Sequence, residues 1–295
     1  MPTIAERRQS FHELHRSGCF AIPNPWDIGS AHYLQHLGFK AIATTSAGFA
    51  FSRGLPDGAV GRDLMIEHIR EIVETTDIPV NADYENGYAD DPGEVAENVR
   101  RCVSTGVAGL SIEDSTGRKE QPLYDVDVAV ERIRAARGAI GDSGALLVAR
   151  AECFLVGITN IDEVIRRLTA YANAGADCLY APGIRDRDHV ATVVAAVAPK
   201  PVNLLIGGAV GLTMSDAAAL GVRRVSVGGA LARAAWGGFM LAAKQLAEDG
   251  RFDGFADAAP HSELQEFFRD DTKRDKRCWL LHDSYRCCRR FHTSV

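Results

Sequence analysis

The chain has 295 residues, of which 46% are hydrophobic and 24% charged, and its formal net charge is −6. This composition is that of an ordinary soluble protein with enough apolar residues for a sizeable core. The negative charge argues against a general attraction to nucleic acid or to an anionic membrane surface. The N-terminus lacks the apolar core of a signal peptide, and every apolar run is far shorter than the roughly 20 residues that span a bilayer. We therefore expect a cytoplasmic protein.

Strand-length apolar runs alternate with amphipathic stretches along most of the chain. Strict alternation implies a parallel sheet with right-handed crossovers, and eight such units imply closure into a (β/α)8 TIM-type barrel. A doubly wound open sheet is the alternative, but no Gly-x-Gly-x-x-Gly motif follows an early strand. The predicted strands are residues 19–22, 41–44, 79–83, 109–112, 146–149, 178–180, 201–206 and 224–227.

The C-terminal part of the chain departs from this alternation. Residues 231–248 are expected to form the eighth helix of the barrel, and the apolar spacing of residues 251–268 allows one more helix, outside the barrel or against another subunit. Residues 269–295 are basic and contain three cysteines without metal-like spacing. We predict a single barrel domain with its helical extension over residues 1–268 and a poorly ordered tail over 269–295.

The other helices are predicted from apolar residues at helical spacing. They cover residues 62–75, 92–104, 126–140 and 161–174.

Charged residues stand at the ends of three consecutive predicted strands: Asp83 and Glu85, then Glu113, then Arg150. Side chains alternate along a strand and the reacting groups of such barrels lie at the C-terminal strand ends, so these groups would meet at the barrel mouth. Carboxylates so close together call for a cation, and an all-oxygen set without histidine suits Mg²⁺ or Mn²⁺. We predict that Asp83 binds the ion directly and that Glu85 and Glu113 hold its waters.

Other residues at the strand ends complete a predicted substrate site. Arg150 is either the bidentate partner of a substrate carboxylate or developing enolate, or an ion-pair partner of Glu152. The small residues Ser46, Ala47 and Gly48 form either a simple tight turn or a turn whose backbone N–H groups bind a carboxylate. Trp26 and Asn203 lie at two further strand ends and are assigned to the same site.

Two kinds of barrel chemistry are excluded by residue placement. No lysine lies inside a predicted strand, as a Schiff-base aldolase requires, and the histidines fall in helical stretches rather than at strand ends, as a zinc aldolase requires. Cys153 is out of phase with Arg150 and Glu152, so we expect a core thiol rather than a nucleophile.

Six segments taken together resemble the isocitrate lyase and phosphoenolpyruvate mutase superfamily over roughly residues 8–268. The resemblance implies an (α/β)8 barrel whose last helix is usually exchanged between paired subunits of a tetramer, Mg²⁺, and a substrate that is or becomes a 2-oxo acid. It places Asp57 near the metal, Ser46 and Ala47 at the substrate carboxylate, and Arg150 at the enolate oxygen. The segments are 24–27 (Asn-Pro-Trp-Asp), 44–48 (Thr-Thr-Ser-Ala-Gly), 81–88 (Asn-Ala-Asp-Tyr-Glu-Asn-Gly-Tyr), 109–114 (Gly-Leu-Ser-Ile-Glu-Asp), 149–152 (Ala-Arg-Ala-Glu) and 174–177 (Ala-Gly-Ala-Asp).

The loop after the fourth strand departs from the superfamily's lyases, which carry a Lys-Lys-Cys-Gly-His type sequence there. Residues 115–122 read Ser-Thr-Gly-Arg-Lys-Glu-Gln-Pro, without cysteine or histidine. The loop is either a lid from which Arg118 or Lys119 reaches the substrate as a catalytic group, or a solvated turn. The mutase branch, in turn, prefers Asp where Glu85 stands.

From these features we expect a Mg²⁺-dependent lyase that cleaves a C–C bond of a small 2-oxo or 2-hydroxy carboxylic acid through a metal-stabilised enolate. The alternatives are a phosphonomutase or phosphonopyruvate hydrolase acting on a P–C bond, and a non-catalytic barrel that binds 2-oxo acids. The expected partners are this small molecule and further copies of the chain in a dimer or tetramer, with no nucleic acid or membrane.

Overall fold

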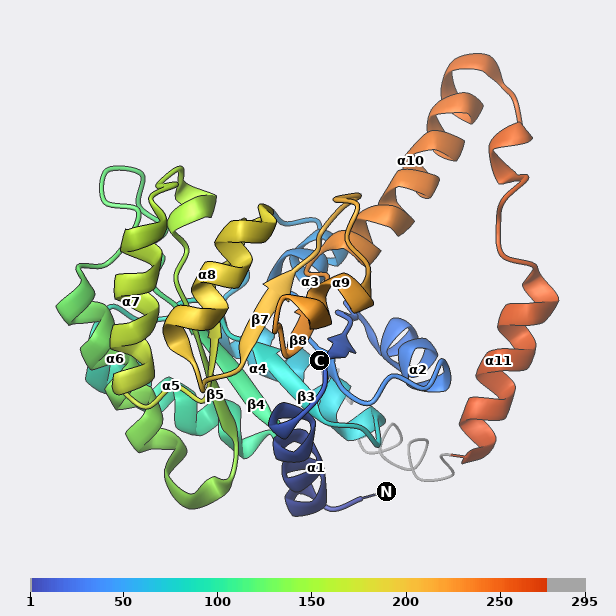
Figure 1. Cartoon of the computed structure of the whole chain (residues 1–295). Coiled ribbons are helices and arrows are strands. Elements are labelled where there is room, and N and C mark those ends of the chain that lie inside the picture. The colour runs from blue at the N-terminus through green and yellow to red at the C-terminus, as the bar shows by residue number, and fades with distance from the viewer. Residues whose placement is uncertain (1, 275–295) are drawn as a thin grey trace, which may run out of the picture. The chain divides into compact units, whose positions relative to one another are not determined.

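The computed structural model describes residues 2–274 (Figure 1). Within them, eight strands form a single sheet in which every neighbouring pair is parallel. The strands are β1 (Phe20–Ile22), β2 (Ile42–Ala43), β3 (Val80–Asp83), β4 (Gly109–Glu113), β5 (Leu146–Arg150), β6 (Cys178–Tyr180), β7 (Val202–Leu205) and β8 (Arg224–Ser226).

The sheet curves into a nearly closed barrel. Its strand order is β1-β8-β7-β6-β5-β4-β3-β2, so β1 and β2 are the two edges. These edges meet just past β1, where the N–H of Ala43 donates to the carbonyl oxygen of Pro23 at 3.0 Å. The predicted (β/α)8 architecture is therefore confirmed.

Helices surround the outer face of the sheet in the part of the chain that forms the barrel (Figure 1). The predicted bounds of α4, α5 and α6 are those observed. Local chemistry explains such starts: at α5, Asp91 accepts hydrogen bonds from the N–H groups of Gly93 and Glu94, and Pro92 occupies the first turn. The helices up to residue 234 are α1 (Ile4–Arg16), α2 (Ile28–His36), α3 (Ser46–Ser52), α4 (Arg62–Thr75), α5 (Pro92–Ser104), α6 (Val126–Ile140), α7 (Ile161–Asn173), α8 (Arg187–Val197) and α9 (Met214–Ala219), with short 3-10 turns η1 (Gly141–Ser143) and η2 (Cys153–Val156).

The chain divides into two compact units, one up to Ala234 and one from Ala235 onward. Helix α10 (Ala230–Asp249) crosses this boundary, and η3 (Asp253–Phe255) and α11 (His261–Arg274) follow it. The additional helix predicted after the barrel is present as α11, but it covers His261–Arg274 rather than residues 251–268. Pro260 has no N–H to donate and disfavours a helical residue before it, so an α-helix starts only at His261.

The predicted extent of the domain, 1–268, and of the tail, 269–295, stays a prediction. Residues 269–274 belong to α11, and residues 275–295 lie outside the described part of the chain. Among the described helices, none is long and apolar enough to cross a membrane.

The two ends of the barrel differ in polarity. At the N-terminal end of the strands, Phe11 of α1 is fully buried in an apolar cluster with Ile22 of β1, Ala43 of β2 and Leu146 of β5. Further along the strands, the barrel encloses polar side chains that line a cavity. Within the described residues α1 covers one end of the barrel, and the cavity lies toward the end where the strands finish.

Burial of His68 predicts acid sensitivity. Its ring stacks on Phe49 at 3.8 Å between centroids, and burial lowers its pKa to about 4. The unfolded chain takes up this proton below about pH 6.5 while the folded chain does not, so stability is lost as pH falls from 6.5 to 4, by up to about 3 kcal/mol. We expect His68→Phe, followed by urea unfolding at several pH values, to lose less stability over this window than the wild type.

The same change at an exposed position, His36→Phe, provides the control. It should retain the acid sensitivity of the wild type, and equal pH slopes for His68→Phe and the wild type would contradict the interpretation.

Candidate active site

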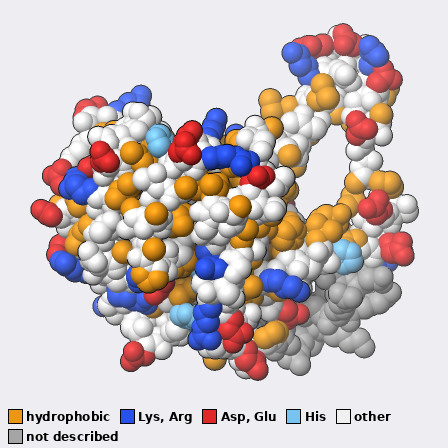
Figure 2. Space-filling view, viewed as in Figure 1, with side chains coloured by type: hydrophobic (Ala, Val, Ile, Leu, Met, Phe, Trp, Pro, Cys, Tyr) orange, Lys and Arg blue, Asp and Glu red, His pale blue; other side chains and the backbone are white. Residues whose placement is uncertain are grey.

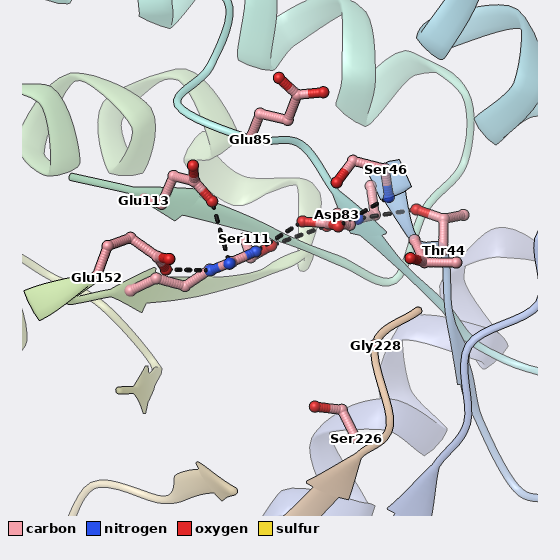
Figure 3. A network of polar contacts seen from close by, with 12 residues as sticks. Thr44, Ser46, Asp83, Glu85, Ser111, Glu113, Glu152, Ser226 and Gly228 are labelled. Carbon is pink, nitrogen blue, oxygen red and sulfur yellow. Dashed lines mark hydrogen bonds and ion pairs between the residues drawn. The ribbon is translucent and has the colours of Figure 1, made fainter. Parts of the chain in front are cut away.

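One guanidinium stands at the centre of the carboxylates at the strand ends. Arg150, the last residue of β5, places Nε 2.8 Å from Glu152 Oε1, Nη1 2.8 Å from Asp83 Oδ1 and Nη2 3.2 Å from Glu113 Oε2. Figure 3 shows these three acidic side chains converging along dashed lines. The β3–β4–β5 adjacency brings them together, because Glu113 pairs with Arg150 in the strand register. The predicted ion pair of Arg150 with Glu152 is present. The position of Arg150 is also compatible with the other interpretation, a partner of a substrate carboxylate or enolate.

Asp83 is held by three elements at once. Its Oδ2 accepts a hydrogen bond from the N–H of Ser46 at 2.9 Å, and its own N–H donates to Thr44 Oγ1 at 2.8 Å. Thr45 caps α3, so that this helix starts beside the end of β3. The position of Asp83 is therefore set by Thr44 just after β2, by Ser46 of α3 and by Arg150 of β5, which gives the carboxylate little freedom to move.

The site holds more negative charge than Arg150 can balance. Burial, together with the charges of Glu152, Asp83 and Glu85, raises the pKa of Glu113 well above its usual value, although Arg150 opposes this shift. Burial likewise raises the pKa of Glu152. Burial opposes the charged form of Arg150, yet the surrounding carboxylates raise its pKa. An added cation would relieve this repulsion.

Glu85 does not lie where strand alternation predicted. Strand β3 ends at Asp83, and Glu85 has a φ of +46°, a left-handed conformation that turns its side chain out of phase. Figure 3 shows Glu85 apart from the cluster around Arg150. Its carboxylate instead accepts a hydrogen bond from the hydroxyl of Tyr88 at 3.0 Å. Burial and the charge of Asp83 raise the pKa of Glu85 to about 7.

A polar cavity of about 170 Å³ opens beside Asp83. Of the predicted site residues, Ser46, Ala47, Asp57, Asp83 and Arg150 line it. Asp57 and Asp83 therefore face the same small space, and burial together with the charge of Asp83 raises the pKa of Asp57. These five residues come from four separate segments of the chain and share one cavity, while their roles in binding stay a prediction.

The donor set fits a hydrated hard cation better than a closed metal cage. Within residues 2–274, no three His, Cys, Asp or Glu side chains come together as a ready-made metal site. Each oxygen of Asp83 accepts one hydrogen bond here and retains a second lone pair. Mg²⁺ commonly keeps several waters and takes only one or two carboxylates, which matches Asp83 with Asp57 across the cavity.

Three predicted substrate residues do not line the cavity: Trp26, Gly48 and Asn203. Gly48 is needed for packing, because a Cβ there would lie 2.6 Å from Thr45 Cγ2 and 3.0 Å from the Cβ of Trp26. Asn203 instead contacts two residues that do line the cavity. It accepts a hydrogen bond from Arg224 Nε at 2.7 Å and donates one to Ser226 Oγ at 2.9 Å.

The loop residues Arg118 and Lys119 also lie away from the cavity. Arg118 pairs with Asp90 at 2.8 Å, and Lys119 is exposed. A bridge between Ser115 and Leu123 closes the base of the loop. In this conformation neither basic side chain reaches the site.

Cys153 is fully buried in η2, and burial raises the pKa of its thiol to about 12. It packs within the main apolar cluster and does not line the cavity. The prediction of a core thiol is confirmed.

Sequence reasoning missed several residues that line the cavity, among them Asn24, Tyr180, Arg224 and Ser226. Asn24 accepts hydrogen bonds from the N–H groups of Val227 and Gly228, so it ties the end of β1 to the end of β8. A signal did exist for Arg224 and Ser226, because they alternate in phase on a predicted strand. Two polar residues in phase on a barrel strand indicate a polar interior at that level.

Comparison with known proteins points to one family. Residues 11–247 match the family model described as phosphoenolpyruvate phosphomutase. The chain is 34% identical to the oxaloacetate decarboxylase of Pseudomonas entomophila (strain L48) over 195 residues, which cover 62% of this chain and 65% of that enzyme.

Two solved structures extend the likeness. A protein from Burkholderia cenocepacia J2315, assigned provisionally as a lyase or mutase, is 48% identical with a TM-score of 0.87, covering 90% of this chain and 97% of that one. A phosphonopyruvate hydrolase in complex with oxalate and Mg²⁺ is 26% identical with a TM-score of 0.80, covering 92% of this chain and 99% of that one.

Removal of Arg150 should leave its three carboxylates buried without a counter-charge. We expect Arg150→Met to destabilise the protein by about 3–5 kcal/mol at pH 8. Because burial raises the pKa of Glu113 and Glu152 in the folded state, the stability they contribute is present at low pH and is lost as pH rises. The variant should therefore be more stable at pH 5 than at pH 8, as measured by urea unfolding.

Arg166→Met is the matched control, since Arg166 is 57% exposed and pairs with Glu163 on the helix surface. Its cost should stay within about 1 kcal/mol at both pH values. A stability of Arg150→Met that does not fall with rising pH would refute the charge balance described above.

Proposed function

Because this chain belongs to the phosphoenolpyruvate phosphomutase family, we propose that it is a Mg²⁺-dependent lyase that cleaves a C–C bond of a small 2-oxo or 2-hydroxy carboxylic acid. The observation that carries the proposal is the cavity at the C-terminal ends of the strands, where Asp57 and Asp83 face the same space as the guanidinium of Arg150. This end of a barrel is where such enzymes place their reacting groups.

In this proposal one carboxylate would bind the metal ion and three others would hold its waters. Asp83 would bind it directly, and Asp57, Glu85 and Glu113 would orient its waters. When bound, Mg²⁺ supplies positive charge beside the carboxylate and keto oxygens of a 2-oxo acid and so favours an enolate. The surplus of buried negative charge around Glu113 and Glu85 supports this assignment, because a dication offsets it.

The chain's own residues would bind and orient the substrate. Arg150 uses one N–H on each nitrogen for a carboxylate, which leaves an N–H on each of Nη1 and Nη2 for an enolate oxygen. Ser46 and Ala47 line the cavity at the start of α3, where they would hold the substrate carboxylate. Leu155 and Leu205 add apolar surface that limits the entry of water.

Cleavage of a C–C bond is supported by the likeness to oxaloacetate decarboxylase, at 34% identity over 62% of this chain. Cleavage of a P–C bond is the second candidate, because a solved structure assigned provisionally as a phosphonomutase is 35% identical over 82% of this chain. A panel of 2-oxo acids, 2-hydroxy di- and tricarboxylates and phosphonates, followed by ¹H and ³¹P NMR with and without Mg²⁺, separates the two reactions. Product formation only from phosphonates would overturn the proposal, as would binding of 2-oxo acids without any product.

Asp83→Asn should abolish Mg²⁺-dependent turnover, with kcat reduced by about 100-fold or more, because it removes the charge of the proposed direct ligand. The measurement is product formation on the active member of the panel. Cys153→Ala is the control, since its thiol is buried away from the cavity. It should keep most of the activity, and full activity of Asp83→Asn would disprove the metal assignment.

We also propose that the protein is a homo-oligomer, a dimer or a tetramer. The unit that starts at Ala235 does not by itself bury its large apolar side chains (Figure 2). Phe239, Met240 and Leu241 on α10 are each about 60% exposed, and exposed apolar patches of this kind usually mark interaction sites.

Light scattering coupled to gel filtration should give an even multiple of the 31.9 kDa chain mass. The double variant Phe239→Glu with Met240→Glu should shift the protein toward the monomer, because it places charge in the proposed interface. Leu37→Glu, at a single exposed apolar residue of the barrel, should leave the mass unchanged. A wild-type monomer would contradict the proposal.

A further inference from the structure

A second arginine lies deep inside the barrel. Arg224, the first residue of β8, is only 2% exposed. Its Nε donates to Oδ1 of Asn203 on β7 at 2.7 Å, and its Nη1 donates to Oδ1 of Asn81 on β3 at 3.3 Å. Strand β7 is adjacent to β8, whereas β3 is separated from β8 by other strands of the barrel. A guanidinium that bonds to both lies in the barrel interior.

Arg224 lines the same cavity as Asp83, but nearer to the N-terminal ends of the strands. Asn81 precedes Asp83 by two residues on β3, so the two levels are about 6–7 Å apart along the strand. The closed end of the barrel lies on the far side of Arg224, where His15 of α1 is close enough for their charges to interact. Burial lowers the pKa of His15 to about 3, so it is neutral and adds no second positive charge beside Arg224.

Arg224 lacks the kind of partner that the other buried arginines have. Arg150 pairs with three carboxylates, Arg167 with two, and Arg132 donates to three backbone carbonyls. Within residues 2–274 no carboxylate pairs with Arg224, and burial lowers its pKa although Cys178 and Tyr180 oppose this shift. A guanidinium has five N–H donors, and two amide oxygens leave most of them without a strong acceptor.

An isolated buried cation is costly unless an anion accompanies it. Asn203 holds Arg224 and Ser226 together, and both line the cavity that a small anion could fill. The cavity is therefore bounded by one cation level at Arg150, where the carboxylates lie, and by another at Arg224, where none lies. A molecule with an oxyanion at each end and a short carbon chain between them matches this separation.

We propose that Arg224 binds the second carboxylate of the substrate, so that the protein selects 2-oxo dicarboxylates of about four carbons over the corresponding monocarboxylates. The inference rests on the proposed function, because the first carboxylate and the keto oxygen occupy the Asp83 level. The preference arises because a monocarboxylate leaves the Arg224 guanidinium buried without an anion.

The test compares two ligands that share a four-carbon chain: 3,3-difluorooxaloacetate, with two carboxylates, and 2-oxobutyrate, with one. Binding is measured by titration calorimetry in Mg²⁺, so turnover is not the readout. The wild type should bind the dicarboxylate at least about 10-fold more tightly. Arg224→Met should weaken the dicarboxylate by roughly 10- to 100-fold and change 2-oxobutyrate by less than about 3-fold.

Arg223→Met is the matched control, since it removes the same charge from the neighbouring residue, whose side chain donates to the carbonyl oxygen of Gly18 outside the cavity. It should change neither affinity. Equal losses for both ligands in Arg224→Met, or a wild type that binds both equally, would overturn the inference. The wild-type comparison decides it even if Arg224→Met does not fold.

The outcome is distinguishable from failure of the proposed function. Selective binding of the dicarboxylate without turnover of any 2-oxo acid would retain the role of Arg224 and reject the lyase. Turnover of 2-oxobutyrate and of oxaloacetate with equal kcat/KM would retain the lyase and reject the role of Arg224.

Discussion

The ion cluster around Arg150 is the interaction on which the site depends. Asp83, Glu113 and Glu152 come from consecutive parts of the sheet, and only the parallel register of β3, β4 and β5 brings them to one guanidinium. Three buried carboxylates against one buried cation leave a net negative charge. The same excess that makes the cluster hard to stabilise alone makes it receptive to a divalent ion.

The barrel interior is organised by depth. Phe11 closes the end where the strands begin, Arg224 occupies the next level, and the carboxylates with Arg150 occupy the level where the strands finish. A ligand in this cavity meets one cation near the carboxylates and another that lacks them.

Conformational strain is concentrated beside the cluster. Glu85 and Tyr88 are the non-glycine residues with positive φ in the described part of the chain, and a hydrogen bond joins their side chains. Such conformations cost on the order of 1–3 kcal/mol each and persist only where the surroundings impose them. The strain turns Glu85 away from Arg150, which leaves its carboxylate free of a basic partner and available to a hydrated ion.

The sequence by itself determined the barrel, the bounds of several helices and the segments that meet at its mouth. Periodicity of two and of 3.6 residues reports which face is buried, and the C-terminal ends of parallel strands must share one edge. Asp83, Ser46 and Arg150 were found this way because each lies in or directly after a strand. Cys153 was excluded by the same phase argument.

Strand periodicity and strand order do not determine the partners of each side chain, which only the tertiary structure decided. Glu85 left the expected face because β3 ends before it, and Asn203 lies behind the cavity because Arg224 and Ser226 occupy the space in front of it. The isolation of Arg224 depends on the absence of carboxylates on β1, β7 and β3 at its own level. Local patterns fix the face on which a side chain lies, whereas its partners depend on strand register and on which residues the other strands place at the same depth.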